Sequence, residues 1–259
     1  MILEKVSQLR SIWRREGAVN SIWAVLGFLL FSDARYRYQR RIERIGYSDA
    51  NKYKLIKIDP NSIKYENRTL MQDSLDELNT VVAGNWDKAT RPFNERIPVR
   101  AAMDHFSEGK PWTQTLYHKN NINRANNGGY YGHTSEKELF KLYKRWEKLY
   151  GKIQSEGYKS QTEISDTRGT DDYPDEITVN IGRNGEIIWQ GQGQHRLAMA
   201  KVIGINEVVA LVTARHAQWQ DIRNEIRKTD TLDELDADLH GYVDHPDLQD
   251  IIPNKNRSI

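Results

Sequence analysis

The sequence predicts an α/β (α+β) fold in which helices flank a small mixed sheet. Residues 177–181 alternate between apolar and polar side chains, Asn184-Gly185 is a strong two-residue turn, and residues 186–189 return as the partner strand. Val208–Val212 is an apolar run typical of a strand that is buried on both faces. Segments with helical periodicity lie before, between and after these strands.

The first 46 residues predict a basic amphipathic helical segment with a break at Gly17. Residues 1–45 contain nine basic and four acidic side chains, an excess of five positive charges. Their apolar run, 22–31, is shorter than the roughly 20 residues that a membrane-spanning helix needs. Two interpretations stay open: the segment packs on the rest of the protein or on a second copy in a homodimer, or it lies on a membrane surface with its arginines toward anionic headgroups.

Residues 53–59 predict a first strand that ends at Asp59-Pro60. The domain that begins at this strand extends to residue 215 and contains an insertion at about 66–134. Four features are expected in the insertion: a helix near 70–81, a turn at 84–87, a helix near 99–106 and an Asn- and Gly-rich loop from 120 to 132.

A long helix is expected to begin after Ser135 and to end at Gly157. Ser135 and Glu138 have the spacing of a capping box, and glycine is a typical residue at a helix end. The apolar side chains of this helix form one stripe, which consists of Leu139, Leu142, Tyr143, Trp146, Leu149, Tyr150 and Ile153. Residues 216–259 predict an acidic C-terminal tail that begins with a helix over about 216–228.

The overall composition narrows the class of protein. The formal net charge is +2, so a nucleic acid or an acidic membrane would have to bind to a local patch. The absence of cysteine excludes disulfides, thiolate metal sites and thiol nucleophiles, and it fits a reducing cytoplasm. The seven histidines show no ligand spacing, so no zinc site is expected. We therefore expect a cytoplasmic protein, peripheral at the inner face of the membrane if the N-terminal segment binds lipid.

The turn Gly191-Gln192-Gly193-Gln194-His195-Arg196, between the hairpin and the next helix, has the features of a phosphate site. Glycines allow the backbone to approach a ligand, the first amides of a helix are unpaired, and the helix dipole adds partial positive charge. His195 adds a hydrogen-bond donor, and Arg196 adds a cation that can bind two phosphate oxygens. The same pattern also occurs in α/β proteins for structural reasons alone, so the spacing leaves both interpretations open.

Residues 175–201 resemble the hairpin and phosphate-binding helix of the ParB/sulfiredoxin superfamily. Residues 204–212 are similar to the next strand of that superfamily, and residues 56–63 are similar to its opening strand and turn. The resemblance is firm over about 175–215, thinner over 53–65 and absent from the first 50 residues and most of the insertion. It implies a domain that binds a nucleoside di- or triphosphate, such as ATP, ADP or CTP, at the turn.

The superfamily includes CTP-binding partition proteins, sulfiredoxin and kinases of free serine. In sulfiredoxin a catalytic cysteine precedes the His-Arg pair; Gln194 stands there in this chain, which rules out reduction of cysteine sulfinic acid. In partition proteins an acidic residue and further arginines occupy the turn, and a DNA-binding domain follows, whereas this chain is short and acidic after Val212. The form with His195 and Arg196 implies a Mg²⁺-dependent phosphotransferase acting on a small hydroxylated acceptor.

Such a reaction needs Mg²⁺, a cation on the phosphates and a carboxylate that receives the acceptor's proton. Arg196 is the expected cation, and His195 is the expected donor to a terminal phosphate oxygen. No motif identifies the carboxylate. Asp59 and Asp87 are the candidates because each lies at an expected loop edge, where aspartate more often has a structural role.

Two other classes of function fit the same sequence. One is a ParB-like DNA-associated protein or nuclease, whose basic N-terminal segment would contact DNA phosphates. The other is a catalytically inactive domain that serves as a membrane-attached scaffold.

Overall fold

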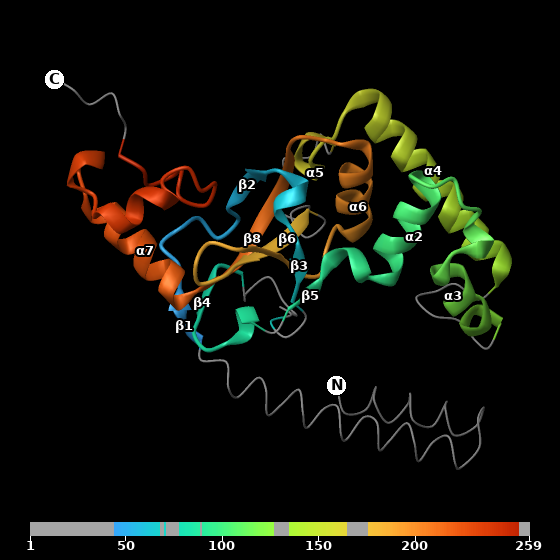
Figure 1. Ribbon diagram of the computed structural model, residues 1–259, viewed down its shortest axis with the longest axis horizontal. Coiled ribbons are helices and arrows are strands. Elements are labelled where there is room, and N and C mark those ends of the chain that lie inside the picture. Colours follow the sequence, from blue (N-terminus) through green and yellow to red (C-terminus); the bar gives the residue numbers. More distant parts are fainter. Residues whose placement is uncertain are drawn as a thin grey trace, which may run out of the picture. The chain divides into compact units, whose positions relative to one another are not determined.

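An eight-stranded mixed sheet forms the centre of the computed structural model, which describes residues 44–67, 70, 78–88, 90–126, 135–164 and 176–253. The strand order is β1-β4-β8-β6-β7-β3-β5, and β2 also pairs with β8 (Figure 1). The strands are β1 (Arg44–Tyr47), β2 (Leu55–Ile58), β3 (Tyr65–Glu66), β4 (Thr80–Val82), β5 (Arg91–Pro92), β6 (Ile177–Ile181), β7 (Ile187–Trp189) and β8 (Val208–His216). The predicted α/β class with a mixed sheet is confirmed.

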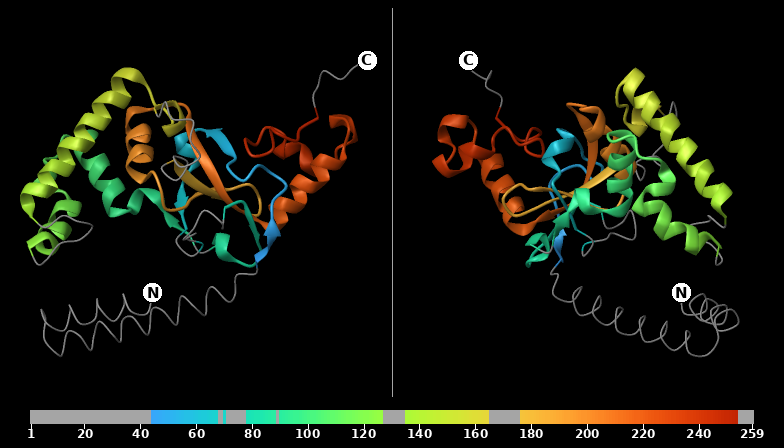
Figure 2. Two further views of the ribbon diagram at one scale, coloured as in Figure 1. Left: turned by 180° about the vertical axis from the view of Figure 1, so that it is seen from behind. Right: turned by 45° about the vertical axis from the view of Figure 1, so that its right-hand side comes forward.

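The described helices lie on both sides of this sheet. They are α2 (Ile97–Phe106), α3 (Leu116–Asn126), α4 (Glu136–Glu156), α5 (Gln161–Ile164), α6 (Gln194–Ile203) and α7 (Ala217–Lys228). Figures 1 and 2 show α7 and the C-terminal turns on one side of the strands, and α2, α3, α4 and α6 on the other. Helix α6 packs against both α2 and α4.

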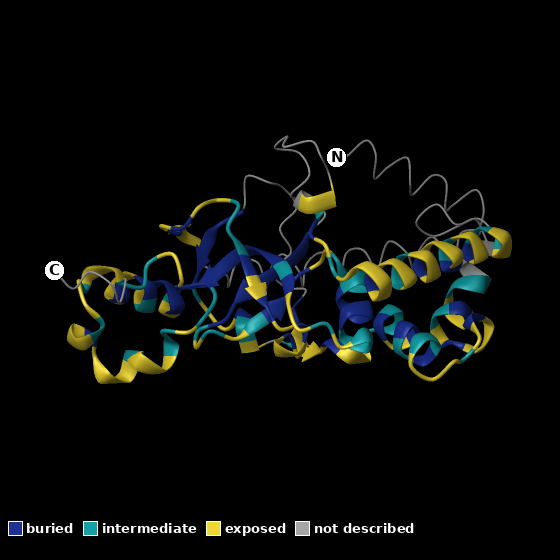
Figure 3. Ribbon diagram, turned by 90° about the horizontal axis from the view of Figure 1, so that it is seen from above, coloured by how far each residue is buried: buried dark blue, intermediate teal, exposed yellow. Residues whose placement is uncertain are grey.

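Strand β8 pairs with three other strands and is buried along almost its whole length. Figure 3 shows that buried residues are concentrated in the central strands. Strand β8 pairs in parallel with β6 and with β4, and antiparallel with β2. Burial on both faces was expected from its apolar composition, and it is confirmed. The strand continues four residues beyond Val212, because β4 pairs with residues Ala214 to His216.

The predicted hairpin is also confirmed. Strands β6 and β7 pair antiparallel, and the amide of Gly182 donates to the carbonyl of Glu186 at 2.8 Å. Gly185 has φ +84°, a conformation that glycine adopts without steric cost. The second strand of the hairpin, β7, therefore ends directly before the glycine turn that precedes α6.

Two apolar clusters hold the helices in place. The first joins β2, β6 and β8 to α6 and α7 through side chains such as Val179, Leu197, Val212 and Trp219. The second is largely aromatic and joins α4 to α2, α3 and α6, with Trp112, Tyr143, Trp146 and Met199 among its buried members. The stripe predicted on the long helix is the face of α4 that enters this second cluster.

The structure corrects several predicted elements. Residues 44–46, expected in the N-terminal helix, belong to β1, which pairs with β4. Thr80 and Val81, expected at the end of the helix near 70–81, form β4 together with Val82, as suits three consecutive β-branched residues beside β8. Residues 71–77 of that expected helix lie outside the described residues. The Asn-rich segment from residue 120 belongs in part to α3, because packing against the aromatic cluster outweighs its weak helix propensity. The Ser135 side chain makes no capping bond among the described residues.

Only the first part of the described C-terminal tail is α-helical. The predicted helix is α7, and the chain after it forms only the short 3-10 turns η7 (Leu232–Glu234) and η8 (Ala237–Tyr242) before its described end at residue 253. The N-terminal segment 1–43 lies outside the described residues, so neither interpretation of it is tested. Within the described ranges, no helix has the length and apolar character required to cross a bilayer.

Candidate functional site

At one position of the turn between β7 and α6, only glycine fits the backbone conformation and the surrounding space. Gly193 has φ +72° and stands at the N-cap of α6. A Cβ atom added there would lie 2.7 Å from Cα of Ile177, which is backbone of β6 and cannot move aside. Gly191 also has a positive φ, +101°, but a Cβ there would meet no atom within 4 Å. Close packing on β6 thus fixes where the turn enters α6.

The loop is held by hydrogen bonds to β6 and β7. Thr178 Oγ1 accepts from the amide of Gln192 at 2.9 Å, and Trp189 Nε1 donates to the Gln192 carbonyl at 2.7 Å. The first backbone bond of the helix runs from the amide of Leu197 to the carbonyl of Gly193 at 3.0 Å. The four amides from Gly193 to Arg196 have no hydrogen-bond partner among the described residues.

The residues that carry these amides line a cavity of about 340 Å³, a size in the range of small-molecule sites. The loop and the first turn of α6 supply one wall, and α4 and α5 supply the others. The described lining residues are Trp146, Leu149, Gln161, Gly191, Gln192, Gly193, Gln194, His195 and Arg196. All six residues of the predicted phosphate turn therefore border one cavity.

Arg96, at the N-cap of α2, orients the first residue of α6. Its Nε and Nη2 donate to Gln194 Oε1 at 3.2 and 2.9 Å, its Nη1 pairs with Glu66 Oε2, and its guanidinium carbon lies 4.2 Å from the centre of the Trp189 ring. Burial lowers the pKa of Arg96 to about 10, so the guanidinium is charged at neutral pH. Because its carbonyl is committed to Arg96, Gln194 has only its NH₂ group left to offer a ligand.

His195 lies against Trp146 of the aromatic cluster. The centre of its ring is 4.2 Å from that of Trp146, and its buried Nε2 has no hydrogen-bond partner among the described residues. Burial, together with the charge of Arg96, lowers the pKa of His195 to about 4. The imidazole is therefore neutral at pH 7, so it could give a ligand a hydrogen bond but no charge.

Arg196 reaches from α6 toward the start of β6. Its Nη1 is 3.8 Å from Glu176 Oε2, and the side chains of the two residues are 13% and 0% exposed. Glu176 Oε1 also accepts from the amide of Gln161 at 2.6 Å, which fixes the start of α5 beside the cavity. The buried carboxylate of Glu176 thus contacts two lining residues. It lies beside the guanidinium of Arg196, and it accepts from the amide of Gln161 at the start of α5.

The two aspartates proposed from the sequence do not border the cavity. Asp59 is exposed and caps the 3-10 turn η1 (Pro60–Ser62), where its side chain accepts from the amide of Asn61 at 2.8 Å. Asp87 lies in η3 (Trp86–Lys88), and its two oxygens accept from Nη2 and Nε of Arg183 at 2.7 Å each. Burial raises the pKa of Asp87, but the bonds from Arg183 outweigh that effect and lower it. Among the described residues, no aspartate or glutamate lines the cavity.

Sequence reasoning missed Trp146, Arg96, Glu66 and Glu176 as parts of the site. Trp146 was recognised only as a member of the apolar stripe on α4. Arg96 and Glu66 lie within or at the edge of the insertion and have no local motif. Glu176 lies within the block 175–201 that resembles the superfamily, directly before the first strand of the hairpin, and only its complete burial distinguishes it from a surface carboxylate.

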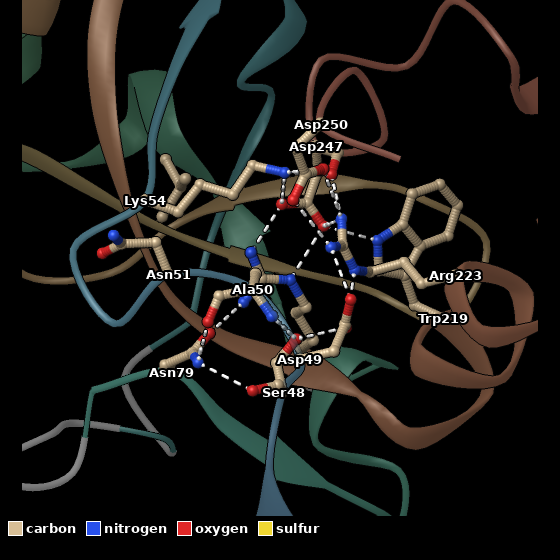
Figure 4. Close-up of polar contacts among 12 residues, drawn as sticks. Ser48, Asp49, Ala50, Asn51, Lys54, Asn79, Trp219, Arg223, Asp247 and Asp250 are labelled. Atoms are coloured by element: carbon tan, nitrogen blue, oxygen red, sulfur yellow. Dashed lines mark hydrogen bonds and ion pairs between the residues drawn. The ribbon is translucent and has the colours of Figure 1, made fainter. Parts of the chain in front are cut away.

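A second cluster of charged side chains shares no residue with the cavity. Figure 4 shows Asp247 and Asp250, from the C-terminal turns, pointing toward Arg223 of α7 and Lys54 before β2. Asp247 also accepts from both Nε and Nη2 of Arg215, at 2.8 and 2.6 Å. The carboxylates of Asp247 and Asp250 thus pair with cations of β8, of α7 and of the segment before β2. These pairs attach the C-terminal turns to the rest of the domain.

Comparison with protein-family models, with curated proteins and with solved structures finds no match for this chain.

Proposed function

We propose that this protein binds the phosphate groups of a nucleotide at the N-terminus of α6. One observation carries the proposal: four successive amides without a partner among the described residues belong to residues that line a cavity, and Arg196 is one of these residues. Backbone N–H groups and a helix dipole attract anions, and an arginine adds directional hydrogen bonds to phosphate oxygens. The resemblance of residues 175–201 to a phosphate-binding helix supports the same assignment.

The remaining lining residues fit the rest of such a ligand. Trp146 and Leu149 of α4 give the cavity an apolar part beside the polar loop. Gln194 contributes an NH₂ donor, since Arg96 occupies its carbonyl. A cavity with one row of donors and one apolar wall suits a phosphate attached to an organic group better than it suits a bare ion.

Phosphoryl transfer to a small hydroxylated acceptor is the use that we propose for this binding, on the resemblance of the His195-Arg196 form alone. Within the described part of the chain, no group of carboxylates and histidines could hold a metal ion. The geometry therefore supports nucleotide binding best, and the contribution we assign to the chain's own residues is to hold and orient the phosphates.

Thermal unfolding with ATP, ADP and CTP, each with Mg²⁺, tests the proposal. A ligand at one hundred times its dissociation constant should stabilise the wild-type protein by about 2.7 kcal/mol. Arg196→Lys keeps the charge but loses the paired hydrogen bonds, so its ligand-induced shift should shrink to a small fraction.

Arg100→Ala is the matched control, because Arg100 is an exposed arginine on α2 that does not line the cavity. Its shift should equal that of the wild type. A wild-type protein that responds to none of the three nucleotides would overturn the proposal.

A further inference from the structure

The outer face of α4 carries a stripe of positive charge, called here the α4 stripe. Its lysines recur at intervals of three or four residues, so they lie on one side of the helix, opposite the apolar side chains that enter the aromatic cluster. At the usual rise of an α-helix the stripe is about 22 Å long. Its members, all exposed, are Lys137, Lys141, Lys144, Arg145, Lys148 and Lys152.

None of these six cations makes an ion pair or a side-chain hydrogen bond in the part of the chain that the structure describes. Glutamates of α4 are used elsewhere: Glu147 accepts from Trp112 Nε1 at 2.9 Å, and Glu156 pairs with Lys159 at 2.9 Å. Like charges three or four residues apart destabilise a helix slightly. The stability of α4 therefore does not account for the stripe.

The C-terminal turns present the opposite charge. The chain from Thr229 to Pro253 contains no lysine or arginine. Asp247 and Asp250 are committed to cations of the domain, but six other carboxylates are exposed and make no ion pair with any described residue. These six, called here the acidic turns, are Asp230, Asp233, Glu234, Asp236, Asp238 and Asp244.

The α4 stripe and the acidic turns lie on opposite sides of the sheet (Figures 1 and 2). They are therefore too far apart to neutralise each other within one copy. The formal net charge of the whole chain is only +2, so one copy does not strongly repel another. Each copy thus offers two separate surfaces of opposite charge.

We propose that copies of this chain associate head to tail, with the α4 stripe of one copy on the acidic turns of the next. One contact then brings both unpaired surfaces together with their opposite charge. A nucleic acid or an anionic membrane would account for the stripe but not for the acidic turns, and the nearly neutral chain has no overall field that would attract it.

The interface is of the heterologous kind, because it joins two different surfaces. Each copy in contact with one neighbour keeps one surface of each pair for another, so the assembly grows as an open chain unless it closes into a ring. Such association needs no nucleotide, and Trp146, on the buried side of α4, takes no part in it.

Charge reversal followed by mixing tests the pairing with the full chain. The stripe variant carries Lys141→Glu, Lys144→Glu and Lys148→Glu, and the turn variant carries Asp233→Lys, Asp236→Lys and Asp238→Lys. Each variant cancels the charge of one surface, so it should stay monomeric when studied separately. A mixture of the two restores one native contact, between the intact stripe of one variant and the intact turns of the other. The mixture should therefore associate and stop at a dimer with one copy of each.

Sedimentation velocity at several protein concentrations measures these states. At about 50 mM salt the sedimentation coefficient of the wild type should rise with concentration, and at about 500 mM salt the rise should disappear, because charges are then screened within about 4 Å. The matched control reverses three exposed cations outside the stripe and should associate like the wild type; it carries Lys64→Glu, Lys88→Glu and Arg100→Glu.

A wild type that stays monomeric at low salt would overturn the proposal, and so would a mixture that does not associate or a control that behaves like the stripe variant. Association that survives in the stripe variant would give the acidic turns another cationic partner, such as residues 1–45. Wild-type protein that stays monomeric but binds duplex DNA or phosphatidylglycerol vesicles through the stripe would show that the stripe binds a polyanion instead. If a triple variant does not fold, Lys144→Glu and Asp236→Lys decide in the same mixing experiment, each separately weakening association severalfold.

Discussion

At the scale of single residues, Gly193 has the strictest backbone requirement in the site. A methyl group there meets the strain of φ +72° and also a contact of 2.7 Å with the β6 backbone at Ile177. Gly193→Ala should therefore lower the free energy of unfolding by more than about 2 kcal/mol and weaken nucleotide binding at least tenfold. Chemical denaturation and titration calorimetry measure the two effects.

Gly191→Ala provides the comparison, because a Cβ there has open space and only the cost of a positive φ, about 1 kcal/mol. Equal losses in the two alanine variants would show that the contact with Ile177 does not position the turn.

Residue patterns in the sequence predict the glycine turn but not the groups that orient it. The sequence predicts Gly191, Gly193 and Arg196 as site residues because a strand, a turn and a helix follow one another directly along the chain. Arg96 lies 98 residues from Gln194, and its role depends on α2 packing against α6. Long-range pairs of this kind leave no periodic or motif signal in one sequence.

At the scale of secondary structure, the elements with strong local signals are those that the sequence predicts. The hairpin turn at Asn184-Gly185, the apolar β8 and the amphipathic α4 all agree with expectation, although β8 runs four residues further. The sequence predicts Thr80 and Val81 as the end of a helix, but with Val82 they form β4, because β8 provides a parallel partner strand. Short strands depend on their neighbours more than on their own propensity.

Helix α4 shields the site, and this shielding can be measured at His195. The Trp146 ring covers the imidazole, and burial is the main cause of its pKa near 4. Trp146→Leu should let water reach His195, so its pKa should rise toward its usual value of about 6.5. NMR titration of the imidazole protons measures the change.

Phe140→Leu, at an exposed position of the same helix, should leave the His195 pKa unchanged. A pKa that stays near 4 in Trp146→Leu would show that α4 is not what desolvates the ring.

At the scale of the whole molecule, the buried charges around Asp247 attach the C-terminal turns to β8 and α7. Burial raises the pKa of Asp247, but the bonds from Arg215 and the nearby cations outweigh this effect and lower the pKa to about 2. The pKa in the folded state is thus below the unfolded value of about 3.9. This carboxylate stabilises the fold above about pH 4, and the contribution is lost as pH falls toward 2.

Asp247→Asn should lower the free energy of unfolding by about 3–5 kcal/mol at pH 7, because it leaves Arg215 and Arg223 buried beside a neutral side chain. The variant should also lose less stability than the wild type between pH 4 and 2. Urea unfolding across this pH range measures both effects.

Asp250→Asn removes a carboxylate that is 37% exposed, so its effect should be clearly smaller. Equal losses in the free energy of unfolding for the two variants would show that burial is not the reason why the charge of Asp247 stabilises the fold.

The central claim is that nucleotide phosphates bind to the amides at the start of α6. Titration of ¹⁵N-labelled protein with Mg²⁺ and ADP, followed by amide NMR, tests it at the atoms concerned. The largest downfield proton shifts should fall on Gly193 to Arg196, because these amides would gain an anionic acceptor. Binding that shifts amides elsewhere while these four stay unchanged would contradict the claim.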